Sequence, residues 1–188
     1  MSLKEEIEVR ILDIDPLEVS NNILEKGGQL VFSGIQERDI FEIPNAGSSK
    51  SWLRLRSAET GTTLAIKIDK GGVVEELEVE VSDHAAMLGI FRALGVAPRA
   101  HHQTHRSLYQ LPGEIEVSID TWPQLDPFLE IEGPSIEAVM TAVALLGLDT
   151  EQITPMNIVQ IYEQEGIMDI VHTDLVFTPS ELDRLNKQ

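Results

Sequence analysis

The sequence predicts an α+β protein in which about eight antiparallel strands form one sheet, with four or five helices packed outside it. Two observations support this prediction. Stretches that alternate charged and aliphatic residues recur along almost the whole chain, and a period of two is typical of strands. Between these stretches lie glycine- and proline-containing turns and a few segments with helical spacing. With 188 residues, the chain is long enough to bury its own core.

The expected elements follow one another in a regular order. Strands are expected at 6–11, 38–43, 52–56, 64–68, 76–81, 106–111, 114–120 and 128–132, with turns such as 44–47 and 70–72 between them. Helices are expected at about 16–25, 83–94, 135–146 and 155–165, and from Pro179 onward. Ser82 or Asp83 is a suitable N-cap for the second helix, and Gly27 and Gly95 suit helix ends. We expect residues 1–166 to form the main domain and 167–188 a C-terminal extension with a short helix.

Composition excludes several classes of protein. The chain has no cysteine, which removes disulfides, thiol catalysis and cysteine zinc sites, and this favours a cytoplasmic location. No apolar stretch is long enough to cross a membrane, and no leader segment is expected. The net charge of −18 argues against nucleic acid and anionic membranes as partners. An anionic small molecule stays possible because local clusters of cations can oppose the global field.

The charged residues of the strands share one face, since side chains alternate along a strand. Either this face is the wet side of an open sheet, or the sheet closes into a barrel with a charged interior and its aliphatic face under the helices. The repeated Glu-x-Glu pattern and the near absence of lysine favour the closed barrel. Ten carboxylates and five cations would then line it. Buried charges must be paired, so the surplus of carboxylates predicts metal ions. All-oxygen ligands favour Mg²⁺ or Mn²⁺, and arginines from several strands would suit a chain of phosphates.

The order of these motifs resembles the CYTH domain of the triphosphate tunnel metalloenzyme superfamily, over about residues 4–165. The series begins with Glu6-Ile7-Glu8-Val9-Arg10, where the family has Glu-x-Glu-x-Lys. It continues with Leu53-Arg54-Leu55-Arg56, Lys67, Glu76-Leu77-Glu78, Arg106, Asp120 and Phe128-Leu129-Glu130-Ile131-Glu132. The resemblance implies an eight-stranded tunnel that binds a triphosphate together with one or two divalent metals.

The resemblance also implies roles for individual residues. Phosphate contacts would come from Arg10, Arg54, Arg56, Lys67 and Arg106. Metal ligands would come from Glu6, Glu8, Glu76, Glu78, Asp120, Glu130 and Glu132, with Glu6, Glu8, Lys67 and Asp120 closest to the chemistry. Trp52 either contacts an organic group, as in the thiamine triphosphatase branch, or packs at the barrel mouth. Two departures stand out: Arg10 replaces a lysine and cannot act as a base, and Thr104 stands where many members have a further lysine.

Three functions remain open at this point. A Mg²⁺- or Mn²⁺-dependent triphosphatase leads, acting on inorganic triphosphate or an organic triphosphate such as thiamine triphosphate. The alternatives are a class IV adenylyl cyclase and a non-catalytic module for phosphorylated ligands. The partner would be a small triphosphate, and the chain a monomer or homodimer. Two other features are expected to be structural or ambiguous. The spacing of His101, His102 and His105 fits no standard zinc site, and the helix near 156–162 either closes a tunnel end or simply packs.

Overall fold

The computed structural model describes residues 3–43 and 50–186, so the expected turn at 44–47 lies outside the described residues. The chain is an α+β protein with a large antiparallel sheet and five α-helices in the described ranges. The described chain divides into two compact units. The first holds residues 1–6, 36–103 and 169–176, and the second holds 7–35, 104–168 and 177–188. None of the helices in the described ranges has the length and apolarity to span a membrane.

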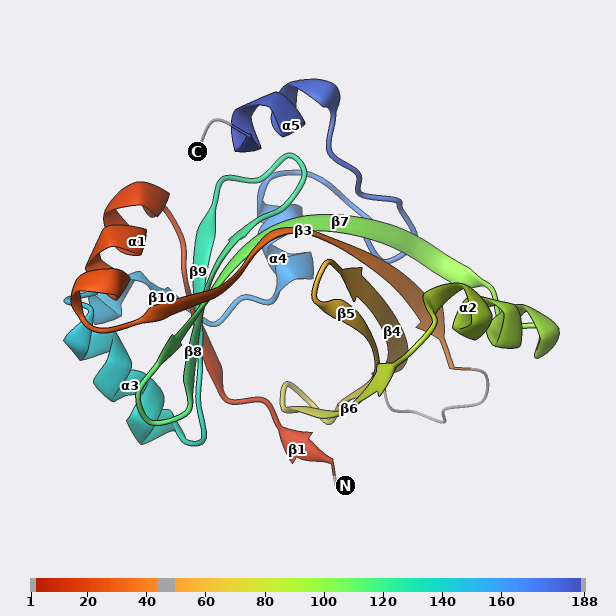
Figure 1. Cartoon of the computed structure of the whole chain (residues 1–188), viewed down its shortest axis with the longest axis horizontal. Helices are drawn as coiled ribbons and strands as arrows, with labels where there is room; N and C mark the ends of the chain where they lie inside the picture. The colour runs from red at the N-terminus through yellow and green to blue at the C-terminus, as the bar shows by residue number, and fades with distance from the viewer. Residues whose placement is uncertain (1–2, 44–49, 187–188) are drawn as a thin grey trace. The chain divides into compact units, whose positions relative to one another are not determined.

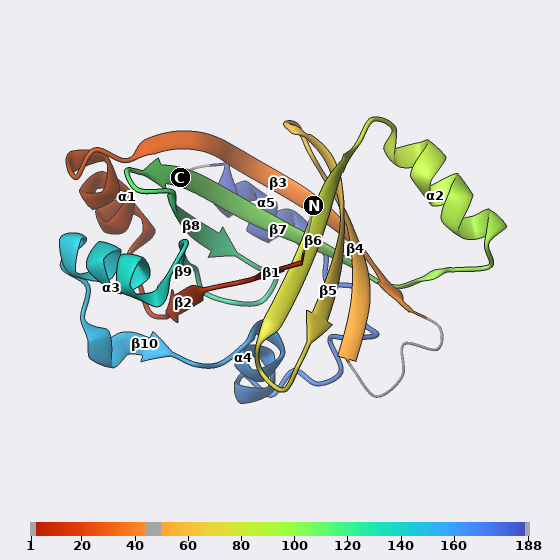
Figure 2. The same cartoon turned by 90° about the horizontal axis from the view of Figure 1, so that it is seen from below.

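The first unit is a run of antiparallel strands. Its elements are β1 (Lys4–Glu5), the second half of β3 (Gln29–Glu42), β4 (Lys50–Ala58), β5 (Gly61–Asp69), β6 (Val74–Val81), α2 (His84–Ala93) and the start of β7 (Pro98–Leu111). Strands β4, β5 and β6 lie side by side as successive hairpins, and α2 follows β6 (Figure 2). Asp83 caps α2 by accepting a hydrogen bond from the Ala86 N–H. The core of this unit joins Phe41, Leu55 and Phe91, with the two phenyl rings 4.5 Å apart.

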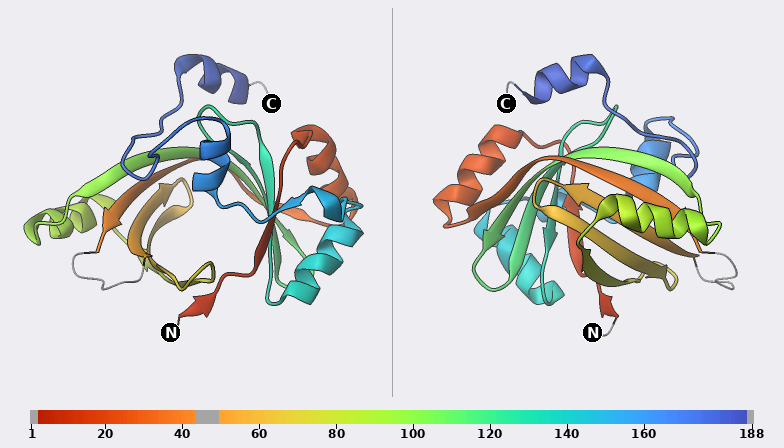
Figure 3. Two further views of the ribbon diagram at one scale, coloured as in Figure 1. Left: turned by 180° about the vertical axis from the view of Figure 1, so that it is seen from behind. Right: turned by 45° about the vertical axis from the view of Figure 1, so that its right-hand side comes forward.

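The second unit packs helices on the aliphatic face of its strands. Its elements are β2 (Glu8–Ile11), α1 (Pro16–Glu25), the first half of β3, the second half of β7, β8 (Ile115–Thr121), β9 (Phe128–Glu132), α3 (Ile136–Leu145), the 3₁₀ turn η1 (Thr150–Gln152), β10 (Ile153–Thr154), α4 (Ile158–Gln164) and α5 (Pro179–Leu185). Helix α3 lies against β8, β9 and β2 (Figures 1 and 3). Ile23 of α1 and Val143 of α3 are buried with Val117 and Leu129 of the strands. The expected covering of the aliphatic faces by helices is confirmed here.

Residue 28 must be glycine for a steric reason, because a larger side chain would collide with Ile23. A Cβ there would lie 2.4 Å from the Ile23 side chain and 2.9 Å from the Ile23 carbonyl oxygen. Gly27, with φ at +89°, adopts the left-handed conformation that glycine tolerates best. The two glycines therefore end α1 and let the chain turn tightly into β3.

The prediction of eight strands in a closed barrel is wrong in two respects: the described sheet has ten strands, and it is not closed. Ten strands are hydrogen-bonded in the order β1-β6-β5-β4-β3-β7-β8-β9-β2-β10, which ends in two edges among the described residues. The cause lies at the first motif, because the expected strand at 6–11 is interrupted at Glu6 and Ile7. Lys4–Glu5 pairs with β6, whereas Glu8–Ile11 pairs with β9. The two-residue strand β10 then adds to β2.

Candidate functional site

In the first unit, the register of β4, β5 and β6 places the predicted charged residues in cross-strand rows. Trp52, Lys67 and Glu76 form one row, and the next row contains Arg54, Ala65 and Glu78. Directly opposite residues on neighbouring strands lie close enough for their side chains to interact. We call the charged side chains gathered here the Arg54 cluster: Glu6, Arg54, Arg56, Lys67, Glu76 and Glu78.

Each cation of the Arg54 cluster bonds to at least one carboxylate. The Arg54 Nη2 donates to Glu76 Oε1 at 2.8 Å and to Glu78 Oε2 at 3.1 Å. The Arg56 Nη2 donates to both oxygens of Glu78 at 3.0 Å. The Arg54 side chain is only 13% exposed, so these bonds form largely out of water. Charged hydrogen bonds of this kind are the strong ones in proteins.

Lys67 lies between two carboxylates, Glu6 and Glu76, whose pKa values shift in opposite directions. Its Nζ donates to Glu6 Oε1 at 2.5 Å and lies 3.3 Å from Glu76 Oε2. Burial and the hydrogen bond with Glu76 raise the pKa of Glu6 to about 8. Burial alone would also raise the pKa of Glu76. The hydrogen bond from Glu6 and the charges of Arg54 and Lys67 outweigh burial and lower the pKa of Glu76 to about 2. Of the two carboxylates, Glu76 is therefore the stronger acid.

A second set of charges occupies the second unit. We call it the Arg106 cluster: Glu8, Arg10, Arg106, Asp120 and Glu130. Arg10 and Glu130 stand opposite each other across β2 and β9, and Arg106 and Asp120 do so across β7 and β8. The carboxylate of Glu130 connects these pairs, since it accepts from Arg10 Nε at 2.6 Å and from Arg106 Nη2 at 2.9 Å.

Both arginines of the Arg106 cluster are firmly charged. Burial alone would lower the pKa of Arg106, but Asp120 and Glu130 raise it above its ordinary value. Arg10 follows the same pattern with Glu130 and Glu8. The Arg10 Nη1 also donates to the Met156 carbonyl oxygen at 3.3 Å, just before α4. In the second unit, carboxylates therefore hold the guanidinium groups of Arg10 and Arg106 in place.

Glu132 lies at the margin of the Arg106 cluster, whereas Asp120 lies within it. Glu132 stands opposite both Glu8 and Glu116 in the register and is exposed, which gives a row of three carboxylates. Asp120 is 1% exposed and makes two bonds to Arg106, so in this arrangement it orients that guanidinium. Helix α4 packs through Tyr162, whose hydroxyl donates to the Pro123 carbonyl at 2.7 Å.

The sequence did not predict a place near the site for three residues beside the Arg54 cluster. Arg38 stands opposite Arg56 in the register of β3 and β4, and it donates to Gln36 at 2.9 Å. Thr63 donates to Glu78 at 3.0 Å. Ala65 lies between Arg54 and Glu78 and is fully buried. Arg38, Ile40 and Glu42 share one face of β3 and do not alternate in character, so the sequence carried no clear signal for Arg38, and nothing in it singles out Ala65.

The donor chemistry fits a hard divalent cation, because all candidate ligands are carboxylates. Within residues 3–43 and 50–186, no three His, Cys, Asp or Glu side chains are arranged to hold a metal ion. The carboxylates instead bond to arginine, lysine and each other. A metal would therefore take oxygens that arginine and lysine now hold. In the part of the chain that the structure describes, the histidines form no metal group either. His101 bonds to Asp39 and Glu37, and His102 bonds to the carbonyls of Ile170 and Thr173.

Long antiparallel strands, with arginines and glutamates in cross-strand rows, define the class as a large antiparallel sheet protein with a charged face. A model of the CYTH domain matches residues 4–155, and the chain belongs to that family. No curated protein matches the chain.

Solved structures agree with this fold. A conserved hypothetical protein from Pyrococcus furiosus has a TM-score of 0.66 at 22% identity, over 81% of this chain and 97% of that one. A candidate adenylate cyclase from Vibrio parahaemolyticus has a TM-score of 0.71 at 12% identity, over 86% and 99%. The Hippeastrum protein HpAC1, a candidate adenylyl cyclase with a dominant triphosphatase activity, has a TM-score of 0.55 at 16% identity, over 89% and 99%.

Proposed function

We propose that the protein is a Mg²⁺- or Mn²⁺-dependent triphosphatase that releases the terminal phosphate of a small triphosphate. The observation that carries this proposal is the Arg54 cluster, where two arginines and a lysine share one face of three neighbouring strands. Guanidinium forks bind phosphate oxygens in pairs, and three adjacent cations suit several phosphates in a row. The triphosphatase activity of HpAC1 supports the choice of hydrolysis within this fold.

Binding would proceed by exchange of partners. The guanidiniums of Arg54 and Arg56 now bond to Glu76 and Glu78, and phosphate oxygens would take the place of these carboxylates. In the second unit, Arg10 and Arg106 would bind phosphate oxygens, as the family resemblance implies. Catalysis would rest on positioning and on stabilisation of the developing charge, as in phosphoryl transfer generally.

The carboxylates released by this exchange would hold one or two metal ions. In the Arg54 cluster these are Glu6, Glu76 and Glu78, and in the Arg106 cluster Glu8, Asp120 and Glu130, with Glu132 beside them. A bound divalent ion would supply charge to offset the phosphates. Glu6 and Glu8 would position water near the terminal phosphate, and Lys67 would bind its oxygens. Arg10 would bind phosphate only, since an arginine does not give up its proton at workable pH.

A product screen tests the proposal. Purified protein is incubated with tripolyphosphate, thiamine triphosphate and ATP, each with Mg²⁺ or Mn²⁺. Release of orthophosphate that is lost in Arg56→Ala supports the triphosphatase. Cyclic AMP with pyrophosphate from ATP would instead identify an adenylyl cyclase, and tight binding without any product would identify a binding module. We further propose a cytoplasmic monomer or homodimer with a small triphosphate as its partner.

A further inference from the structure

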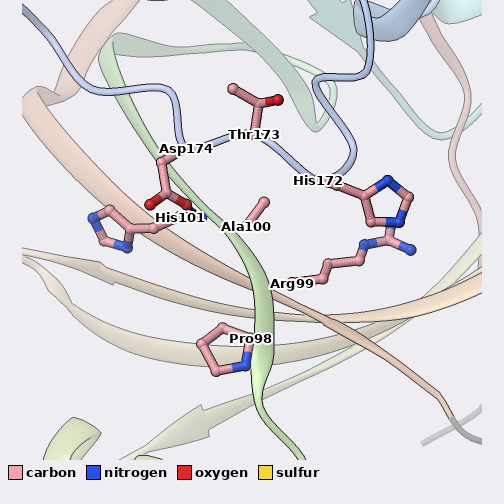
Figure 4. A pocket seen from close by; sticks show the side chains of 7 residues that line it. All are labelled: Pro98, Arg99, Ala100, His101, His172, Thr173 and Asp174. Atoms are coloured by element: carbon pink, nitrogen blue, oxygen red, sulfur yellow. Dashed lines mark hydrogen bonds between the residues drawn. The ribbon is translucent and has the colours of Figure 1, made fainter.

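A pocket within the first unit lies outside the Arg54 cluster. Its volume is about 570 Å³. One wall is the start of β7, with Pro98, Arg99, Ala100 and His101, and the other is His172, Thr173 and Asp174 (Figure 4). The two walls are far apart in the sequence. The pocket thus joins the first unit's sheet to the segment 169–176.

Arg99 is the feature that points to a ligand. Its Nε–H is buried, and within the described ranges it finds no hydrogen-bond acceptor. Burial lowers the pKa of the Arg99 guanidinium, and only the charge of Glu42 opposes this shift. A buried donor without an acceptor is costly, and a charged one more so. An acceptor supplied by a ligand would remove this cost.

The other charged groups of the pocket already have partners. Both ring nitrogens of His101 bond at 2.8 Å, one to Asp39 and one to Glu37. Asp174 accepts the backbone N–H of His101 at 2.8 Å. His172 bonds through Nδ1 to Asp169, so its Nε2 is the ring nitrogen that a ligand would meet. The donors left for a ligand are the Arg99 guanidinium and the His172 imidazole.

We propose that this pocket binds an oxyanion, such as a phosphate or carboxylate group, held by Arg99 and His172. A guanidinium matches the oxygens of such a group in a two-point contact. The ring of Pro98 and the methyl group of Ala100 add apolar groups to the lining of the pocket. The site is separate from the proposed triphosphate site and does not rest on that function.

Binding here has a structural consequence. Segment 169–176 is attached to β7 by the Gln103 N–H to the Leu175 carbonyl at 2.7 Å, and by the Leu175 N–H to the His101 carbonyl at 2.9 Å. Because the pocket draws residues from both sides, an occupant would tie the segment more firmly to the strand. The amides of Gln103 and Leu175 should then exchange with solvent more slowly.

The test is an NMR titration of the full chain with sodium phosphate, against sodium chloride at equal ionic strength. The Arg56→Ala background weakens phosphate binding at the proposed triphosphate site. We expect saturable shifts at residues 99–101 and 172–174, and slower exchange at Gln103 and Leu175. Arg99→Gln should weaken this binding about tenfold or more, since a charged hydrogen bond is lost. Arg92→Gln, at an exposed arginine of α2, should leave it unchanged.

Arg99→Gln should also keep full triphosphate turnover, which separates this site from the catalytic one. Equal phosphate affinity in the Arg99→Gln protein would overturn the proposal. So would identical shifts with chloride, because they would reflect screening alone. Failure of triphosphate hydrolysis in the wild-type protein would leave the NMR result untouched, so the two proposals fail separately.

Discussion

Arg106 and Asp120 stand directly opposite each other on β7 and β8 and form a two-point ion pair, with Arg106 Nε 2.7 Å from Asp120 Oδ1 and Nη2 bonded to Oδ2. The carboxylate is almost wholly buried. Removing one partner of such a pair destabilises the native state, because the charge of the other partner would stay buried without compensation.

We therefore expect Asp120→Asn to destabilise the protein. The loss should be about 2–4 kcal/mol, moderated by Glu130, which still accepts from Arg106. Urea denaturation measures it. Glu116→Gln is the matched control, because it makes the same change at an exposed position of the same strand. A loss equal to that of the control would show that the Arg106–Asp120 pair is not critical for stability.

The Arg54 cluster should control turnover rather than stability. Arg54→Ala or Arg56→Ala should lower kcat/KM for the triphosphate by about 10²-fold, since each removes a preorganised charged donor. The melting temperature should change little, because Glu76 and Glu78 keep other partners. Arg92→Ala, at an exposed arginine in the same unit, serves as the control. Wild-type turnover in both cluster variants would place the site elsewhere.

Activity should depend on a divalent metal. A chelator should abolish phosphate release, and Mg²⁺ or Mn²⁺ should restore it. The metal should also raise the melting temperature, since it binds the folded state. Glu130→Gln should increase the Mg²⁺ concentration needed for half-maximal activity, whereas Glu137→Gln on the exposed start of α3 should not. Full activity in chelator would contradict the proposed role of the carboxylates.

Trp52 offers a test of the organic group. It shares a cross-strand row with Lys67, so a ring bound near that lysine could stack on it. Trp52→Ala should then reduce turnover of thiamine triphosphate several-fold to about thirtyfold, from about 0.5–2 kcal/mol of stacking, and spare tripolyphosphate. Trp122→Ala should lower stability and both activities together, because Trp122 packs against Tyr162. Equal losses on both substrates in Trp52→Ala would remove the thiamine interpretation.

His101 should make stability depend on pH. Burial alone would lower its pKa, but its bonds to Asp39 and Glu37 raise the pKa above the ordinary value. Protonation therefore favours the folded state, and this contribution is complete below about pH 6.5, the unfolded value. It is lost as the pH rises through the raised folded pKa. The difference in unfolding free energy between wild type and His101→Gln should shrink from pH 6 to pH 9, as urea titrations would show. A constant difference would exclude this contribution.

Much of the sheet could be predicted from the alternation of charge and aliphatic residues, because each strand carries its own two-residue period. The interruption at Glu6 and Ile7 could not be predicted. It arises because Lys4–Glu5 pairs with β6 whereas Glu8–Ile11 pairs with β9, and the sequence of the segment does not show which strand each part meets. The first half of β3 was missed because Leu30 and Val31 are both exposed and break the alternation. The pairing of Arg38 with Arg56 depends on register, which a single strand does not reveal.

Ala65 carries no charge, yet its size decides how two charged residues meet. Only a methyl group separates Arg54 from Glu78 across β5, and this lets their side chains bond over the width of that strand. A valine or leucine at this position would force the two apart without touching any charge. Attempts to redirect the protein toward bulkier or smaller phosphorylated compounds should therefore include this inert position in their libraries, alongside the arginines that a motif search would choose.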